Sequence, residues 1–293
     1  MDTSFSENMR GAAFMAISMA AFVINDTNMK LAAEHLSLFQ ALFLRGIFTT
    51  ILLVSLALYK KAIIFHIPKG DRKILVLRLI GELGGTLFFL NALFNMPLAN
   101  ATAIVQALPL AVTLAGALFL REAVGWRRYL AIGFGFIGVL IIVRPGSEGF
   151  NEFSLSAVAS IFCIVLRDLS TRRLSPAIPS LFVALLTSVA IMLVGGIFST
   201  VTDWKPVTTE GLTLLATASV FVIIAYLCSI KTMRVGDISF SSPFRYTLLI
   251  WAILLGFFVF GDIPDSWTIV GSLIIVGTGV YTFYREQAVA RKP

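Results

Sequence analysis

The sequence predicts an all-α integral membrane protein with ten transmembrane helices, arranged as two inverted five-helix repeats with both termini in the cytoplasm. Three features support this prediction: the composition, a series of long apolar runs, and a polar motif that occurs twice. Of the 293 residues 58% are hydrophobic and only 13% are charged, and the mean hydropathy is +0.91. This composition excludes a soluble chain.

The apolar runs follow one another with short gaps, and each is close to the roughly 20 residues that a helix needs to cross the hydrocarbon core. The first run is too long for a signal-peptide core, so we expect an uncleaved first helix. Cys163 and Cys228 fall inside apolar runs and indicate neither a disulfide nor a metal framework. The ten runs cover residues 11–31, 36–58, 74–95, 98–120, 126–143, 153–171, 179–200, 210–230, 238–260 and 267–284.

The net charge of +7 is distributed asymmetrically along the chain. If the N-terminus is cytoplasmic, the cytoplasmic segments include the basic loop Lys60–Lys73 and the turn Arg121–Arg128. Only Lys30, Arg144 and Lys205 then lie in the segments on the opposite side. By the positive-inside rule this bias predicts cytoplasmic termini. Because the basic residues are explained by topology, we expect no nucleic-acid partner.

A polar motif in residues 91–144 has a weaker copy in residues 227–286. A constant offset also superposes Asp26 on Asp168 near the ends of the first and sixth runs. The duplication predicts one repeat over residues 11–144 and a second over 154–284. Since each repeat has an odd number of spans, the two copies must have opposite orientations, and such repeats place a site at their interface near the membrane midplane. Within the motif the matched pairs are Asn100 with Asp237, Gly116 with Gly256, Glu122 with Asp262, and Trp126 with Trp267.

Charged side chains inside the spans are candidates for a functional site, because they are costly in a membrane and usually face the interior of the bundle. Arg45 is the deepest of them, near the middle of the second run. Arg78 and Glu82 are four residues apart, so they share a helix face and can pair. Arg245 lies about two turns inside the ninth run, just after Pro243. A buried Arg needs a counter-charge, which a carboxylate or an anionic substrate group would supply.

Two interpretations stand for several of these charges. Asp26, Asp168, Arg167 and Lys231 lie nearer the ends of their runs, where they either contact substrate or a gate, or extend to the interface and cap a helix. The Arg78–Glu82 pair is also explained as a satisfied structural pair. The sequence does not decide between these two roles.

Polar and aromatic residues supply further candidates. Asn91 and Asn95 flank the short turn after the third run, and Gln106 falls one helical turn before Pro109, which frees a backbone carbonyl. Aromatic rings in the spans can stack on a planar ligand. The candidate substrate-binding and gating residues are Asp26, Arg45, Arg78, Glu82, Asn91, Asn95, Gln106, Asp168, Arg245, Tyr246 and Trp251.

The sequence has no glycine-rich phosphate loop, zinc-protease helix motif or nucleophile elbow. We therefore expect no enzyme activity, no cofactor and no metal site. Without an ATP-binding motif, active transport would be driven by a gradient, and the carboxylates of Asp26, Glu82 and Asp168 make proton coupling a hypothesis. The alternatives from other classes are a lipid-modifying membrane enzyme and a non-transporting membrane scaffold.

The motif itself resembles a known family. The run from Pro109 to Glu122 with Trp126 and Gly138 is similar to the EamA branch of the drug/metabolite transporter superfamily. The second copy departs from that pattern, with Asp262 at the position of the usual Glu. The resemblance implies a bacterial inner-membrane carrier of a small molecule that works by alternating access. It also implies a central cavity lined by the first, third, fourth, sixth, eighth and ninth spans.

Within that branch the chain is similar to vitamin and metabolite carriers of alpha-proteobacteria. Riboflavin uptake is the specific expectation, because the aromatic residues and buried polar groups suit a flavin. The alternatives are import of S-adenosylmethionine and export of an amino acid or another metabolite. The sequence leaves open whether the protein is a monomer or a homodimer.

Overall fold

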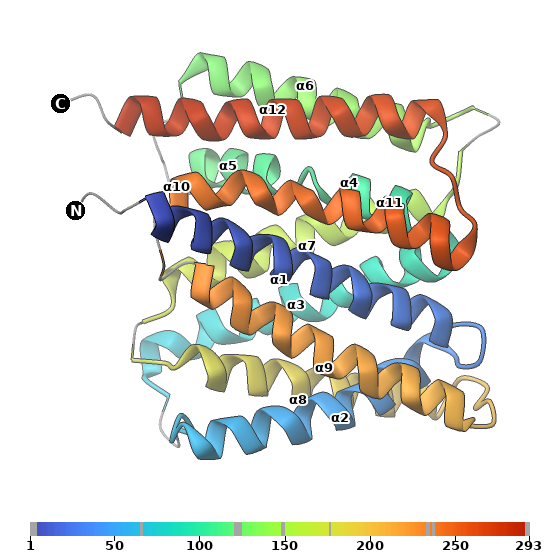
Figure 1. Ribbon diagram of the computed structural model, residues 1–293. Coiled ribbons are helices and arrows are strands. Elements are labelled where there is room, and N and C mark those ends of the chain that lie inside the picture. Colours follow the sequence, from blue (N-terminus) through green and yellow to red (C-terminus); the bar gives the residue numbers. More distant parts are fainter. Residues whose placement is uncertain are drawn as a thin grey trace.

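The computed structural model describes residues 5–64, 67–119, 125–147, 150–175, 177–232, 235 and 238–290. The secondary-structure elements in these residues are all helices, as predicted. The long helices lie side by side, and both termini are on one side of the bundle, called here the terminal side (Figure 1). Arg121, Glu122 and Asp237 of the repeated motif lie outside the described residues. The elements are α1 Phe5–Ala32, α2 Leu38–Tyr59, α3 Lys69–Asn95, α4 Leu98–Val105, α5 Leu108–Phe119, α6 Trp126–Val143, α7 Phe153–Arg173, α8 Ser180–Ser199, α9 Thr209–Thr232, α10 Ile238–Ser241, the 3-10 helix η1 Ser242–Tyr246, α11 Thr247–Phe260 and α12 Ser266–Ala290.

Nine spans in the described part of the chain are long and apolar enough to cross a membrane. The sequence predicts ten, and the difference is α1, which has 28 residues but carries Asn25, Asp26 and Asn28 in its second half. These polar residues lower its hydropathy without shortening it. Because α1 packs along α9 and α11 in the middle of the bundle, it keeps its polar side chains away from the surrounding surface.

Two of the predicted spans are interrupted. The span Leu98–Phe119 consists of α4 and α5 with a break at Gln106 and Ala107. Pro109 explains this break, because a proline ring clashes with the carbonyl group four residues earlier, and α4 ends at that residue, Val105. The predicted run 238–260 likewise consists of α10, η1 and α11, with Pro243 at the start of η1.

The strongest helix pairs each join one half of the chain to the other. Helix α1 packs on α9, α2 on α8, α3 on α7, and α6 on α12. If the predicted repeats are exchanged, the pair α1–α9 becomes α7–α3, and the other two pairs map onto themselves. Exchanging the repeats also turns the contact of α1 with α11 into a contact of α7 with the interrupted span α4–α5. Both contacts are present. The inversion of the two halves stays a prediction, and this pairing is the pattern that it would produce.

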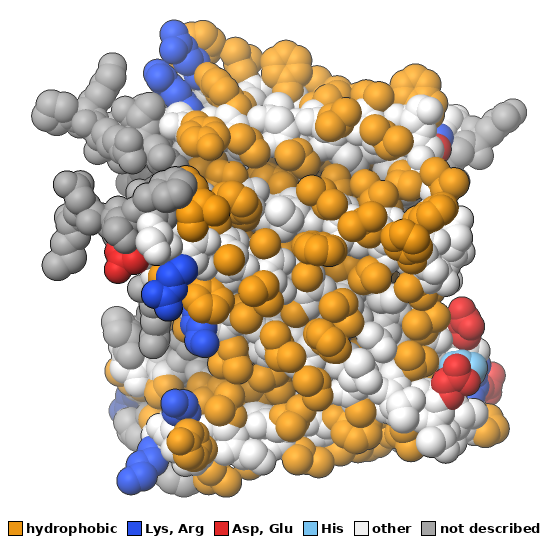
Figure 2. All heavy atoms as spheres, in the orientation of Figure 1, with side chains coloured by type: hydrophobic (Ala, Val, Ile, Leu, Met, Phe, Trp, Pro, Cys, Tyr) orange, Lys and Arg blue, Asp and Glu red, His pale blue; other side chains and the backbone are white. Residues whose placement is uncertain are grey.

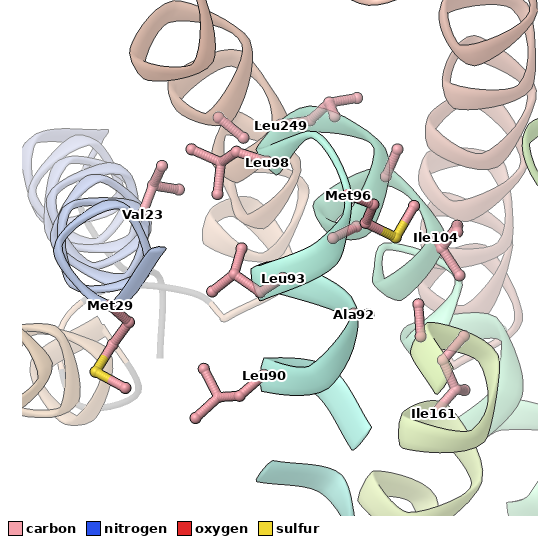
Figure 3. Close-up of a cluster of buried hydrophobic side chains, with 14 of the residues drawn as sticks. Val23, Met29, Leu90, Ala92, Leu93, Met96, Leu98, Ile104, Ile161 and Leu249 are labelled. Carbon is pink, nitrogen blue, oxygen red and sulfur yellow. The ribbon is translucent and has the colours of Figure 1, made fainter. Parts of the chain in front are cut away.

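The main hydrophobic core lies where α1, α3, α4, α7 and α11 meet. Figure 3 shows Val23 and Met29 of α1 on the side facing Leu90 and Leu93 of α3. All four side chains are at most 2% exposed. The core therefore holds the interrupted helix α4 against α1, α3 and α7, and fixes the position of the break that follows it.

Helices α3 and α7 approach each other very closely. A Cβ atom added to Gly81 would lie 2.6 Å from the backbone nitrogen of Arg167, so only glycine allows this approach. The next residue of α3, Glu82, is thereby brought beside Arg167.

The outer surface matches that of a membrane protein. Figure 2 shows hydrophobic side chains covering the side of the bundle. Most of the visible Lys and Arg side chains gather at the terminal side, and several Asp and Glu side chains lie at the opposite end, called here the far side. The protein is thus an all-helical integral membrane protein, and its lipid bilayer contact is the broad apolar belt between these two ends.

Candidate substrate cavity

A cavity of about 260 Å³ lies in the interior of the bundle. Its volume is near the lower end of the roughly 300–1,000 Å³ typical of small-molecule sites. Its walls come from the six spans that the family resemblance implies, and also from α2. The lining residues are Met19, Phe22, Asn25, Asp26, Arg45, Glu82, Gly85, Thr86, Phe89, Leu90, Thr102, Val105, Gln106, Leu108, Pro109, Ile164, Arg167, Val222, Tyr226, Arg245 and Leu248.

Both helix breaks open onto this cavity. Gln106 lines it at the break between α4 and α5, and Arg245 lines it from η1. Leu108 and Pro109 also line it, so the N-terminus of α5, the positive end of its dipole, borders the cavity. Interrupted spans at matching positions in two halves are a common way for transporters to build a site for polar ligands.

Asp26 of α1 and Arg45 of α2, called here the Asp26–Arg45 pair, line the cavity without closing on each other. None of the ion pairs found among the described residues joins them. Asp26 accepts one hydrogen bond, 2.8 Å from the side-chain amide of Asn25. The Nε of Arg45 is buried and has no partner within the described part of the chain. Opposite charges therefore face one cavity with unused hydrogen-bonding capacity.

A second set of charges is fully paired. One carboxylate oxygen of Glu82 accepts a hydrogen bond of 3.2 Å from Arg78, and the other accepts one of 3.3 Å from Arg167. Arg167 also contacts Asp168 at 2.8 Å, and Arg78 donates a hydrogen bond of 2.7 Å to Thr187 of α8. These four charged residues, called here the Glu82 cluster, contain two positive and two negative groups, so the cluster has no net charge. Of its members, Glu82 and Arg167 line the cavity.

Arg245 differs from both sets. Within the described residues it forms no ion pair and no hydrogen bond through its guanidinium group, and its side chain remains exposed. Because it lines an interior cavity, its guanidinium presents free surface to whatever occupies that cavity. An unpaired Arg in such a place is costly unless a ligand supplies the counter-charge.

Aromatic rings form part of the wall. Phe22 of α1 and Tyr226 of α9 pack edge to face with ring centroids 5.5 Å apart. Tyr226 is still 46% exposed, and it lines the cavity together with Phe89. Rings of this kind present apolar faces on which a planar ligand group can stack.

The structure brings together five of the predicted site residues: Asp26, Arg45, Glu82, Gln106 and Arg245 all line the cavity. The others lie outside the lining. Arg78 and Asp168 support it as members of the Glu82 cluster.

The remaining four predicted residues have other surroundings. Asn91 donates a hydrogen bond of 2.9 Å to Ser156 of α7, and Asn95 is exposed and donates to the backbone of Asn91. Trp251 lies on the outer surface, 37% exposed. Tyr246 packs its hydroxyl against Gly279 of α12, where an added Cβ would lie only 1.7 Å away.

Several lining residues were not among the predicted ones. Phe22 lies three residues before Asn25 and four before Asp26 on α1, so helical spacing from Phe22 was an available signal. For Arg167 the sequence leaves open a substrate or gating role and extension to the interface, and its place in the lining favours the first. Tyr226 lies inside a long apolar run, and a single-sequence pattern gives no sign that it faces the interior.

A family comparison decides the class of this protein. The model of the EamA-like transporter family matches residues 9–144 and again residues 153–284. The chain belongs to the EamA-like transporter family. An EamA-like transporter is a membrane carrier and not an enzyme, so its substrate is a small molecule that crosses the bilayer.

Named relatives differ in what they carry. This EamA-like transporter is 24% identical to the S-adenosylmethionine uptake transporter of Rickettsia bellii, over 96% of each chain. It is 31% identical to the riboflavin transporter of Vibrio cholerae, over 62% of this chain and 61% of that protein. A solved crystal structure has the same fold, with a TM-score of 0.64, 20% identity, and coverage of 94% of this chain and 98% of the other.

Proposed function

We propose that the protein is a secondary transporter in the bacterial inner membrane that takes up S-adenosylmethionine or a close chemical relative. The observation that carries this proposal is the unpaired Arg245 in a cavity with an aromatic wall. Three arginines and two carboxylates line the cavity, so it has an excess of positive charge among its ionisable groups. A ligand whose carboxylate meets the unpaired Arg245, whose cationic group meets Asp26 and whose planar base meets the aromatic rings would match this set.

Riboflavin is the second candidate. It is favoured by the 31% identical relative from Vibrio cholerae and by the rings of Phe22, Phe89 and Tyr226. Riboflavin carries no charge at neutral pH, so it would leave the guanidinium of Arg245 without a counter-charge. Leaving desolvated charges unpaired costs several kcal/mol, about 3–5 in comparable buried pairs. The charged ligand is therefore preferred.

For the mechanism we propose alternating access, in which two inverted five-helix units, residues 11–144 and 154–284, rock about the cavity with both termini in the cytoplasm. The helix pairing between the halves and the collection of basic residues at the terminal side support this arrangement. The far side is tied together by Lys30 of α1, which donates hydrogen bonds to the carbonyl groups of Leu93 in α3 and of Met96 just after it. The same ammonium group lies 5.3 Å from the ring centre of Phe260. Access from the far side would require these contacts to break.

The test is uptake of radiolabelled S-adenosylmethionine and, separately, riboflavin by a bacterial host that takes up neither. The intact protein and an Arg245→Gln variant are expressed to equal membrane levels. We expect S-adenosylmethionine uptake by the intact protein and a loss of about 10-fold or more in the variant, because a charged hydrogen bond contributes about 1.5–3 kcal/mol. Uptake of riboflavin alone would favour the second candidate, and uptake of neither would overturn both.

A further inference from the structure

The Asp26–Arg45 pair is a place where opposite charges share a cavity without satisfying each other. Both side chains lie in the interior of the bundle, and no ion pair among the described residues joins them. A pair whose role was structural would be expected to close, as Arg78 and Glu82 do at 3.2 Å. The open arrangement leaves room for a group that carries both charges.

Hydrogen-bonding capacity is also unused on both sides of the pair. On the acidic side the Oδ1 of Asn25 lacks a partner within the described residues, and the same amide holds the carboxylate of Asp26. On the basic side the Nε of Arg45 lacks a partner there, and so does the Nε2 of Gln106, which lines the same cavity. Acceptors are thus free near the carboxylate, and donors are free among the basic and amide groups.

The N-terminus of α5 adds to the positive character of the cavity. Leu108 and Pro109, its first two residues, line the cavity directly after Gln106. The aligned peptide dipoles of α5 place partial positive charge there, which favours an anionic group. A ligand carboxylate in this cavity can therefore be stabilised by Arg45, by Gln106 and by the dipole of α5.

We infer that the Asp26–Arg45 pair recognises the zwitterionic head group of an α-amino acid. The ligand's ammonium group binds Asp26 and the amide oxygen of Asn25, and its carboxylate binds Arg45 and Gln106. This inference rests on the proposed function and deepens it, because it assigns the substrate to the amino-acid derivatives and gives each end of the head group its partners. The planar part of the ligand then lies toward the rings of Phe22 and Tyr226, which line the same cavity.

The first test uses the purified full-length transporter and a set of ligands that share the adenosine group and from which the sulfonium charge and the head group are removed separately or together. Binding is measured by displacement of radiolabelled S-adenosylmethionine. S-adenosylhomocysteine keeps the whole head group, decarboxylated S-adenosylmethionine lacks the carboxylate, and methylthioadenosine lacks the head group altogether. We expect S-adenosylhomocysteine to compete within about 10-fold of S-adenosylmethionine. The other two should be weaker by about 10-fold and 100-fold or more, from charged hydrogen bonds of about 1.5–3 kcal/mol each.

The second test uses Asp26→Asn and Arg45→Gln, with Asp265→Asn as a control for loss of a carboxylate remote from the cavity. We expect Arg45→Gln to bind the decarboxylated compound as well as the intact protein does, while losing affinity for S-adenosylmethionine. Asp26→Asn should lose affinity for every ligand with an ammonium group. The control should bind all of them normally. Since the comparison is between ligands for one folded preparation, an altered folded yield does not affect it.

The outcomes separate the inference from the proposed function. If the intact protein binds S-adenosylmethionine and methylthioadenosine equally, the head-group inference is overturned and the transporter assignment stands. If it binds riboflavin and not S-adenosylmethionine, and Arg45→Gln leaves that binding unchanged, both the specific substrate and the inference fail. Failure to bind any compound with an amino-acid head group overturns the inference as well.

Discussion

The Asp26–Arg45 pair and the Glu82 cluster use the same types of side chain and have opposite characters. In the Glu82 cluster every charge has a partner within 3.3 Å. In the Asp26–Arg45 pair the charges face one cavity and leave donors and acceptors unused. A buried network that is fully satisfied holds helices in place, whereas one that is open is available to a ligand. Being charged and inside a span therefore does not by itself identify a binding residue.

The largest expected effect in this comparison is on stability. Glu82→Gln removes the carboxylate that accepts both Arg78 and Arg167, and leaves two like charges close together. We expect a loss of about 3–5 kcal/mol in the free energy of unfolding, the cost of breaking a buried ion pair. Thermal unfolding of the purified protein in detergent measures it. Asp26→Asn is the matched control and should lose clearly less stability, since no ion pair among the described residues joins Asp26 to Arg45. Equal losses in the two variants would contradict the comparison.

The next effect is on ligand affinity and concerns Arg245. Because its guanidinium has no partner among the described residues, Arg245→Gln should leave the unfolding temperature nearly unchanged. Affinity for a carboxylate-bearing ligand should fall by about 10–100-fold, and Arg245→Lys should recover part of it. Equilibrium binding and thermal unfolding of the same preparations check both statements. A drop in stability with unchanged affinity would place Arg245 with the structural charges.

A smaller effect is expected from the residue that holds Arg245 in position. Tyr246 packs against Gly279, where an added Cβ would lie 1.7 Å from the tyrosine oxygen. Gly279→Ala should therefore displace η1, lower stability by about 1–3 kcal/mol as overpacking does, and reduce transport several-fold. Gly277→Ala on the same helix is the control, because an added Cβ there meets nothing within 4 Å. Identical unfolding temperatures and uptake rates for the two variants would show that the contact with Tyr246 is unimportant.

The smallest effect concerns a charge pair outside the spans. Asp265 pairs with Arg144, and the backbone N–H of Thr268 donates to it. Partial burial raises the pKa of Asp265, but the bonds from Thr268 and Arg144 outweigh this and hold that pKa below its ordinary value. The pair therefore adds stability above the unfolded-state pKa of about 3.9, and this stability is lost as the pH falls through the lower folded-state pKa. For an exposed pair we expect at most about 1 kcal/mol.

The measurement is the unfolding temperature of the intact protein and Asp265→Asn between about pH 7 and pH 3, where other carboxylates titrate equally in both. The variant should be slightly less stable at neutral pH, and the difference should shrink toward the acid end. A difference that stays constant over this range would mean that the charge of Asp265 is not involved.

Much of the fold could be predicted from the sequence, because membrane spans depend on local apolar content. The breaks were less visible, although Pro109 and Pro243 mark both of them. Which helix packs on which could not be predicted, because close approaches such as that at Gly81 depend on the surface of the partner helix. The repeat makes packing between helices of different halves a reasonable expectation, but it does not specify which helices form pairs.

The candidate site was predicted in part. Depth in the span singled out Arg45 and Arg245, and both line the cavity. Asn91 was chosen for its type and its place near a turn, but on α3 it lies about half a turn around the helix axis from Glu82, at 3.6 residues per turn. The face that lines the cavity carries Glu82, Gly85, Thr86, Phe89 and Leu90. Sequence reasoning fixes which residues share a face, and only the packing of the neighbours decides which face is inside.

The pairing of helices across the two halves has a consequence for biosynthesis. A growing chain releases α1, α2 and α3 into the bilayer before α9, α8 and α7 have been made, so each waits for its main neighbour. During that interval Glu82 lacks Arg167, which follows 85 residues later. Arg78 is on the same helix and leaves the ribosome first, so it can neutralise Glu82 from the start. The within-helix pair thus leaves the apolar part of α3, residues 74–95, without net charge as it inserts. The cross-helix bond completes the network when the second half arrives.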